Sequence, residues 1–140
     1  MLKLKNLLLS TILVLTGFGA RANDGAIISP DEALALAAKG ELIIVDVRTP
    51  AEWRQSGVPS GAATVELNDD FVSGVLKVVN GDRTRPVGVI CRSGRRSAAA
   101  QSLLLKQGFV RVLNINEGVL GDASGRGWQA RGLPMRPFTP

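Results

Sequence analysis

Cys91 is the only cysteine of this chain, and three arginines follow it within five residues. Guanidinium groups and free backbone N–H groups beside a thiol favour the thiolate, which is the nucleophilic form of cysteine. The apolar run at residues 87–90 predicts a buried strand, and residues 97–105 predict a helix. The thiol therefore lies where a strand ends and a helix begins, a place that attracts negative charge. This setting predicts nucleophilic chemistry at Cys91.

A single cysteine is commonly a small apolar residue of the core. Two features argue against that interpretation here. An inert core thiol needs no cationic loop beside it, and Gly94 allows the backbone to approach a ligand closely. We therefore interpret Cys91 as a catalytic residue.

The segment after Cys91 supplies groups that can bind an anion. Arg92 and Arg95 are candidates to hold substrate oxygens through paired N–H groups, and a serine hydroxyl lies between them. The loop N–H groups can form a nest around negative charge. Arg96 has two open interpretations, since it either binds substrate or folds inward and fixes the loop. The expected substrate-binding residues are Arg92, Ser93, Gly94, Arg95 and Arg96, and the backbone of Ser97 completes the loop.

Residues 1–22 have the three parts of a secretory leader. Lys3 and Lys5 form a basic start, residues 7–19 are largely apolar, and Ala20-Arg21-Ala22 fits a cleavage site. The apolar part is shorter than the about 20 residues of a membrane-spanning helix. We expect cleavage after Ala22, a periplasmic or secreted location, and no membrane association of the mature chain. Retention of the leader as an amino-terminal anchor is the alternative.

Residues 23–140 have the length of one domain with one core. Removal of the leader lowers the number of basic residues from 17 to 14, against 12 acidic ones, so the charge gives no general case for nucleic-acid binding. The remaining arginines gather around the thiol, which favours a small anion as partner. The chain has no histidine, which excludes histidine-ligated metals and histidine-dependent hydrolysis, and we expect no metal site.

Strands and helices alternate along this domain. The patterns predict strands at residues 26–28, 42–47, 62–65, 87–90 and 110–113, helices at 30–39, 69–79 and 97–105, and helical turns after Thr49 and at Trp128. Ser29 to Glu32 and Thr49 to Glu52 both have the spacing of a capping box, and residues 56–61 are expected to be loop. This order predicts an α/β, three-layer sandwich in which helices flank a mostly parallel central sheet of about five strands.

Reactive groups in such a sheet lie beyond the carboxyl ends of its strands. Asp46 ends one predicted strand and Cys91 follows another, so both are expected at the same edge. We interpret Asp46 as an acceptor that organises the loop, and we expect Arg48 to pair with Glu52 on the following helical turn. All three residues are predicted to support the site rather than to react.

Three motifs in this order resemble a single-domain rhodanese. They are DVRTPAEW at residues 46–53, CRSGRRS at 91–97, and GW at 127–128 followed by GLP at 132–134. The resemblance implies a thiosulfate sulfurtransferase in which Cys91 takes a sulfane sulfur from a small anionic donor and carries it as a persulfide. It implies cyanide, a thiol or a partner protein as acceptor, and no metal or organic cofactor. We expect a monomer.

The chain departs from the family pattern at three places. Residues 56–62 lack the usual histidine, Glu117 stands where a glycine is usual, and residues 120–126 look like an insertion. The segment from Cys91 to Arg96 has the length typical of sulfur-handling members, whereas phosphatase-like or arsenate-reductase-like relatives have one more residue, so we rank those enzymes lower. A rhodanese module that binds a partner or carries sulfur or redox signals, with little or no turnover, is the other alternative.

Overall fold

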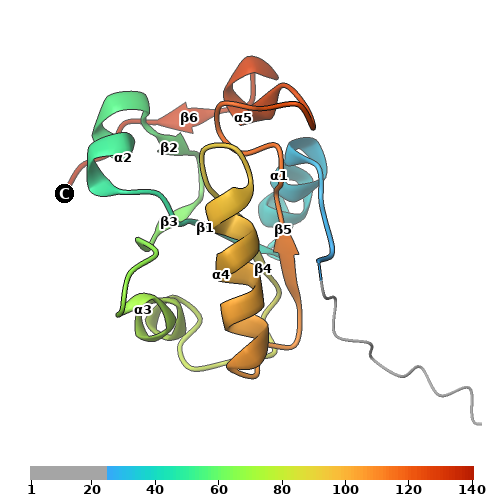
Figure 1. Ribbon diagram of the computed structural model, residues 1–140, viewed down its shortest axis with the longest axis vertical. Coiled ribbons are helices and arrows are strands. Elements are labelled where there is room, and N and C mark those ends of the chain that lie inside the picture. The colour runs from blue at the N-terminus through green and yellow to red at the C-terminus, as the bar shows by residue number, and fades with distance from the viewer. Residues whose placement is uncertain (1–24) are drawn as a thin grey trace, which may run out of the picture.

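The computed structural model describes residues 25–140, so the predicted leader and its cleavage site lie outside the described residues. The elements along the chain are α1 (Pro30–Ala38), β1 (Ile43–Asp46), α2 (Pro50–Ser56), β2 (Val58–Pro59), β3 (Ala63–Thr64), α3 (Phe71–Val78), β4 (Val87–Ile90), α4 (Arg95–Lys106), β5 (Val112–Asn114), α5 (Gly127–Ala130) and β6 (Met135–Arg136). Figure 1 shows α4 crossing in front of the sheet. The predicted α/β class with a parallel sheet is confirmed.

The central sheet has four strands in the order β3-β1-β4-β5, and every neighbouring pair is parallel. Residues 26–28, predicted as a further strand, contribute a single parallel bridge from Ile27 to Asn114 at the β5 edge. All four residues of β4 are buried, as expected for a central parallel strand that is covered on both faces. The sheet therefore presents the ends of β1 and β4 side by side.

Alternate residues of the strands supply two separate hydrophobic clusters. Ile44 and Ile90 pack with residues of α1, α2 and α5, whereas Val45 and Val89 pack with residues of α3 and α4. Side chains alternate between the two faces of a strand, which is why neighbouring residues enter different clusters. The result is the predicted three-layer sandwich. Among residues 25–140, no helix combines the length and the apolar character that crossing a membrane requires.

A second, two-stranded antiparallel sheet pairs Val58 with Arg136 and Pro59 with Met135. The sequence predicted only loop at residues 56–61, so this sheet was missed. Gly57 has a positive φ of 77°, and a Cβ there would lie 2.6 Å from the Arg136 carbonyl oxygen. Close packing against the last strand therefore requires glycine at this position.

The two predicted capping boxes have different outcomes. At α2 the Thr49 hydroxyl accepts from the Glu52 N–H, and the Glu52 carboxylate accepts from the Thr49 N–H. At α1 only the first half forms, from the Glu32 N–H to the Ser29 hydroxyl. The Glu32 side chain is exposed, so water solvates its carboxylate. The prediction of a full capping box is confirmed at α2 and wrong at α1.

Candidate active site

Cys91 directly follows β4, and its side chain is almost completely buried, with 1% exposed. The Gly94 N–H donates to its sulfur at 3.1 Å, and the Ser97 hydroxyl oxygen lies 3.3 Å from the sulfur. The same hydroxyl donates to the Gly94 carbonyl at 3.1 Å. The segment thus folds back onto its own thiol. The sequence predicted only a backbone role for Ser97, so the contact of its hydroxyl with the sulfur was missed.

Helix α4 begins at Arg95, two residues earlier than predicted, and Gly94 is its N-cap with a φ of 100°. A left-handed residue at this point turns the chain abruptly from β4 into α4, which brings the first turn of the helix over the thiol. Within the described part of the chain, five backbone N–H groups of this segment donate no hydrogen bond: those of Arg92, Ser93, Arg95, Arg96 and Ser97. These N–H groups are therefore free to donate hydrogen bonds to a negatively charged group.

Two glycines lock this loop against the chain that follows β5. A Cβ on Gly94 would overlap the Asn116 carbonyl, and a Cβ on Gly118 would overlap the Arg92 carbonyl. The Val119 N–H donates to the Cys91 carbonyl at 2.8 Å, and the next N–H donates to the Arg92 carbonyl at 3.0 Å. The loop shape is therefore fixed by backbone contacts on both sides.

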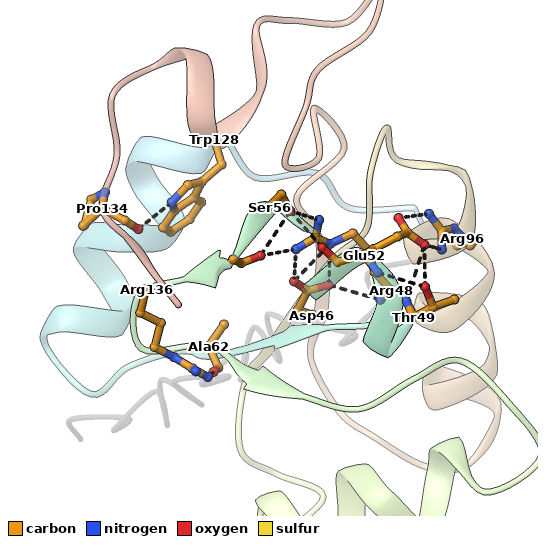
Figure 2. Close-up of polar contacts among 11 residues, drawn as sticks. Asp46, Arg48, Thr49, Glu52, Ser56, Ala62, Arg96, Trp128, Pro134 and Arg136 are labelled. Carbon is orange, nitrogen blue, oxygen red and sulfur yellow. Dashed lines mark hydrogen bonds and ion pairs between the residues drawn. The ribbon is translucent and has the colours of Figure 1, made fainter. Parts of the chain in front are cut away.

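Arg48 pairs with Asp46, at 2.8 Å between Nη2 and Oδ2, so the predicted pair with Glu52 is wrong (Figure 2). Its guanidinium also donates to the Ser56 hydroxyl at 2.7 Å and to the Gly57 carbonyl at 2.8 Å. The Arg48 N–H also donates to the Asp46 carboxylate at 3.1 Å, so the bend just after β1 places Arg48 beside Asp46. Both side chains are buried, and a buried charge requires a partner of opposite sign. The pair ties the end of β1 to the end of α2.

Glu52 instead binds Arg96 through two contacts, 2.6 Å from Nη1 to Oε1 and 2.9 Å from Nη2 to Oε2. The hydrogen bond from Arg96 is the main reason that the pKa of Glu52 falls from 4.5 to about 2. The same hydrogen bond raises the pKa of Arg96 above its ordinary value. Of the two interpretations left open for Arg96, these contacts favour a role in fixing the loop.

Two hollows flank the loop. The first, of about 230 Å³, is lined by Arg48, Glu52, Gln55, Ser56, Arg92 and Leu120. The second, of about 260 Å³, is lined by Ser93, Gly94 and Arg95 from the loop, and by Ala98, Asn116, Asp122 and Ser124. Arg92 and Arg95 therefore face different hollows, although the sequence placed them in one binding group.

Three residues of the first hollow, Gln55, Ser56 and Leu120, were not predicted as site residues. Gln55 and Ser56 follow Glu52 by three and four positions on α2, so helical spacing could have identified them. Leu120 belongs to the segment that the sequence marked only as an insertion. No local pattern indicates that this segment returns to the thiol.

Glu117 is buried and holds the glycine-rich segment after it. Its carboxylate accepts from the Gly127 N–H at 3.1 Å and from Arg131 at 2.7 and 2.8 Å. The Arg131 hydrogen bond is the main cause that lowers the pKa of Glu117. This acid, noted in the sequence as a replaced glycine, positions the segment that bears Leu120. Across residues 25–140, no three His, Cys, Asp or Glu side chains gather as a group that could hold a metal ion.

Comparison with known proteins gives consistent results. The family model of the Rhodanese-like domain matches residues 29–123. A protein named sulfurtransferase from Allochromatium vinosum is 33% identical over 100 residues, which cover 71% of this chain and 83% of the relative. Thiosulfate sulfurtransferase GlpE of Pseudomonas entomophila is 36% identical over 91 residues, covering 65% of this chain and 78% of the relative. The crystal structure of Rv0390 from M. tuberculosis has 34% identity and a TM-score of 0.63, and the match covers 81% and 98% of the two chains.

Proposed function

Because the chain belongs to the family of rhodanese-like domains, we propose that it is a sulfurtransferase that carries a sulfane sulfur on Cys91. The relatives named sulfurtransferase support the transferase class. The observation that carries the proposal is the Cys91 sulfur, which receives the Gly94 N–H and faces the Ser97 hydroxyl beneath the first turn of α4.

The reaction is two displacements at sulfur. The Cys91 thiolate attacks the outer sulfur of a donor such as thiosulfate, and the donor S–S bond breaks. Sulfite leaves with the bonding electron pair, and Cys91 holds a persulfide. An acceptor such as cyanide or a thiolate then attacks the terminal sulfur, and the Cys91 thiolate leaves and is regenerated. The protein supplies a nucleophile, donors and position, and the proposal needs no metal or organic cofactor.

Ser97 and the loop amides stabilise the sulfur charge. While Cys91 is a thiol, its S–H can donate to the Ser97 oxygen and the Ser97 hydroxyl donates to the Gly94 carbonyl. When Cys91 ionises, the hydroxyl can rotate and donate to sulfur instead, so the thiolate gains a second donor beside the Gly94 N–H. The unused N–H groups at the start of α4 are then available for the terminal sulfur of the persulfide.

The charged residues around the loop divide into two roles. Arg92 is exposed, directly follows Cys91 in the chain and lines the first hollow, so we assign it to the donor anion, and Arg95 is its counterpart at the second hollow. Asp46, Arg48, Glu52 and Arg96 are bound to one another in pairs and act as positioning residues. We also propose that the chain is processed after Ala22 and acts as a monomer in the periplasm or outside the cell.

The test is mass spectrometry of the processed protein after incubation with thiosulfate and, separately, with benzenethiosulfonate. We expect a gain of one sulfur atom on Cys91 that is lost when cyanide is added. Cys91→Ser should gain no sulfur and nearly retain its melting temperature, because the smaller serine hydroxyl fits the space of the thiol and has the same two polar neighbours. An unmodified Cys91 after both donors overturns the proposed function, and it would favour a module that binds a partner.

A further inference from the structure

The Gly94 carbonyl oxygen has three hydrogen-bond donors around it. The Ala98 N–H and the Ser97 hydroxyl each lie 3.1 Å from this oxygen, and the side-chain nitrogen of Asn114 lies 3.4 Å from it. A carbonyl oxygen has two lone pairs, so at most two of the three donors bind it well at one time. The contact of Asn114 is the longest and is near the limit for a hydrogen bond. Asn114 is therefore the donor that is bound least tightly while Ser97 also donates.

Asn114 is the last residue of β5 and is only 6% exposed. Its backbone N–H donates to the Ala26 carbonyl, and its own carbonyl accepts from the Ile28 N–H, so the main chain fixes its place. Its Oδ1 atom is buried and has no hydrogen-bond partner among residues 25–140. Exchanging the amide oxygen and nitrogen would bring two oxygens together at the Gly94 carbonyl, so the orientation is determined. A buried amide with one long contact stabilises this state of the protein little, which indicates a use in another state.

A negatively charged sulfur on Cys91 creates that other state. The Ser97 hydroxyl has one hydrogen, which it donates either to the Gly94 carbonyl at 3.1 Å or to the sulfur at 3.3 Å. When the hydroxyl turns to the sulfur, the carbonyl loses one donor. The Asn114 nitrogen is already 3.4 Å away and can then shorten its contact, so the carbonyl keeps two donors in both states. The exchange therefore avoids the cost of an acceptor that is left short of a donor.

From these contacts we propose that Asn114 is a positioning residue, which takes over the Gly94 carbonyl when the Ser97 hydroxyl turns to the sulfur. Asn114 thereby makes that hydroxyl available to the Cys91 thiolate and to the persulfide that follows. This inference rests on the proposed function and identifies a residue that acts on the sulfur only through Ser97. The Asn114 amide makes no bond to sulfur and gives up no proton. The Gly94 N–H remains the other donor to the sulfur throughout.

A double-mutant cycle of Asn114→Ala and Ser97→Ala tests this route. The rate of Cys91 alkylation by iodoacetamide at neutral pH is measured for the four proteins, together with their melting temperatures. We expect Asn114→Ala to slow alkylation about fivefold when Ser97 is present, the effect of one ordinary hydrogen bond. When Ser97 is already replaced by alanine, the same change should alter the rate by less than about twofold. A residue that acted only through packing would slow alkylation equally in both backgrounds.

A second variant and a control separate this role from stability. Asn114→Leu keeps a branched side chain and removes both polar atoms, so it should slow alkylation like Asn114→Ala while its melting temperature stays near that of the wild type. Gln101→Ala is the matched control, because Gln101 is a buried amide of α4 that donates to the Ala26 and Val112 carbonyls at 2.8 and 2.9 Å. This control should lower the melting temperature and leave the alkylation rate within about twofold of the wild type.

Single-turnover persulfide formation from thiosulfate gives an independent readout. Asn114→Ala should lower the rate at saturating thiosulfate about fivefold and change the half-saturating concentration by less than about twofold, because Asn114 is buried and lines neither hollow of the loop. Equal slowing of alkylation by Asn114→Ala in both Ser97 backgrounds, or no slowing by either Asn114 variant, would overturn the inference while sulfur transfer by Cys91 stands. If the wild type forms no persulfide and the cycle still shows coupling, the proposed function is wrong and the exchange at the Gly94 carbonyl is upheld.

Discussion

The Glu52 carboxylate and the Arg96 guanidinium, 44 residues apart in the chain, are joined by two contacts of 2.6 and 2.9 Å. Glu52 belongs to α2, which follows β1, and Arg96 belongs to α4, which follows β4. β1 and β4 are neighbours in the sheet, so the pair closes the gap between the two helices at the carboxyl edge (Figure 2). The first turn of α4, above the thiol, is thereby fixed to α2.

Acid should weaken the fold through this pair. The pKa of Glu52 is lowered from 4.5 to about 2, so its stabilising contribution is complete above about pH 4.5 and is lost as the pH falls towards 2. Glu52→Gln should cost about 1 kcal/mol near neutral pH, the upper end for exposed ion pairs, and should flatten the acid dependence. Urea unfolding across this pH range measures both effects. Glu41→Gln, at an exposed acid without an ion pair among the described residues, should behave like the wild type.

Arg48→Met should destabilise the protein by about 3–5 kcal/mol, because it leaves the buried Asp46 carboxylate without its partner. The double variant Asp46→Asn with Arg48→Met removes both charges. Its free energy of unfolding should fall by less than the sum of the decreases in the two single variants. Denaturant unfolding of the four proteins gives the coupling free energy. A coupling free energy near zero would show that the interaction between Asp46 and Arg48 does not stabilise the fold.

Ser97→Ala should slow persulfide formation about tenfold, since it removes one charge-assisted donor to sulfur. Alkylation of Cys91 at neutral pH should slow by a similar factor while the melting temperature stays close to that of the wild type, a combination that loss of packing alone would not produce. Stopped-flow alkylation and thermal unfolding measure the two effects. Ser102→Ala is the control, because Ser102 is an exposed serine of the same helix. An unchanged alkylation rate would remove the Ser97 hydroxyl from the reaction.

Gly118→Ala and Gly40→Ala form a matched pair, since φ is +71° at one and +72° at the other. A Cβ at Gly40 meets nothing within 4 Å, so that variant should lose only about 1–2 kcal/mol from backbone strain. A Cβ at Gly118 meets the backbone of Arg92, which adds about 1–3 kcal/mol of overpacking. The melting temperature of Gly118→Ala should therefore be lower than that of Gly40→Ala. Equal melting temperatures would mean that the loop is free to move.

Sequence patterns were sufficient for the framework of this protein. Apolar, β-branched runs predicted β1 and β4, and the capping residue Thr49 predicted the start of α2, because both signals are local. The same signals placed Cys91 at the sheet edge beside Asp46. Strands β2 and β6 were missed because they have only two residues each and pair across more than 70 positions.

Partners of charged residues were harder to predict. Arg48 had two acids within four residues, and the spacing of a helix favoured Glu52, although Arg48 precedes the helix. An Asp side chain commonly accepts from the backbone N–H two residues later, as Asp46 does from Arg48, and this was the signal that would have given the correct pair. The Glu52–Arg96 pair and the position of Leu120 depend on how distant segments meet, and no local pattern contains that information.

The contacts of Gly94 and Gly118 mean that the cradle around the thiol is complete before any donor arrives. A loop that becomes ordered only on binding costs conformational free energy at each encounter, and this one is spared that cost. The side chains that line the first hollow, such as Leu120 and Gln55, can differ without any change in this backbone. Under the proposed function, a chain built in this way can acquire a new donor through one or two surface substitutions while its nucleophile stays unchanged.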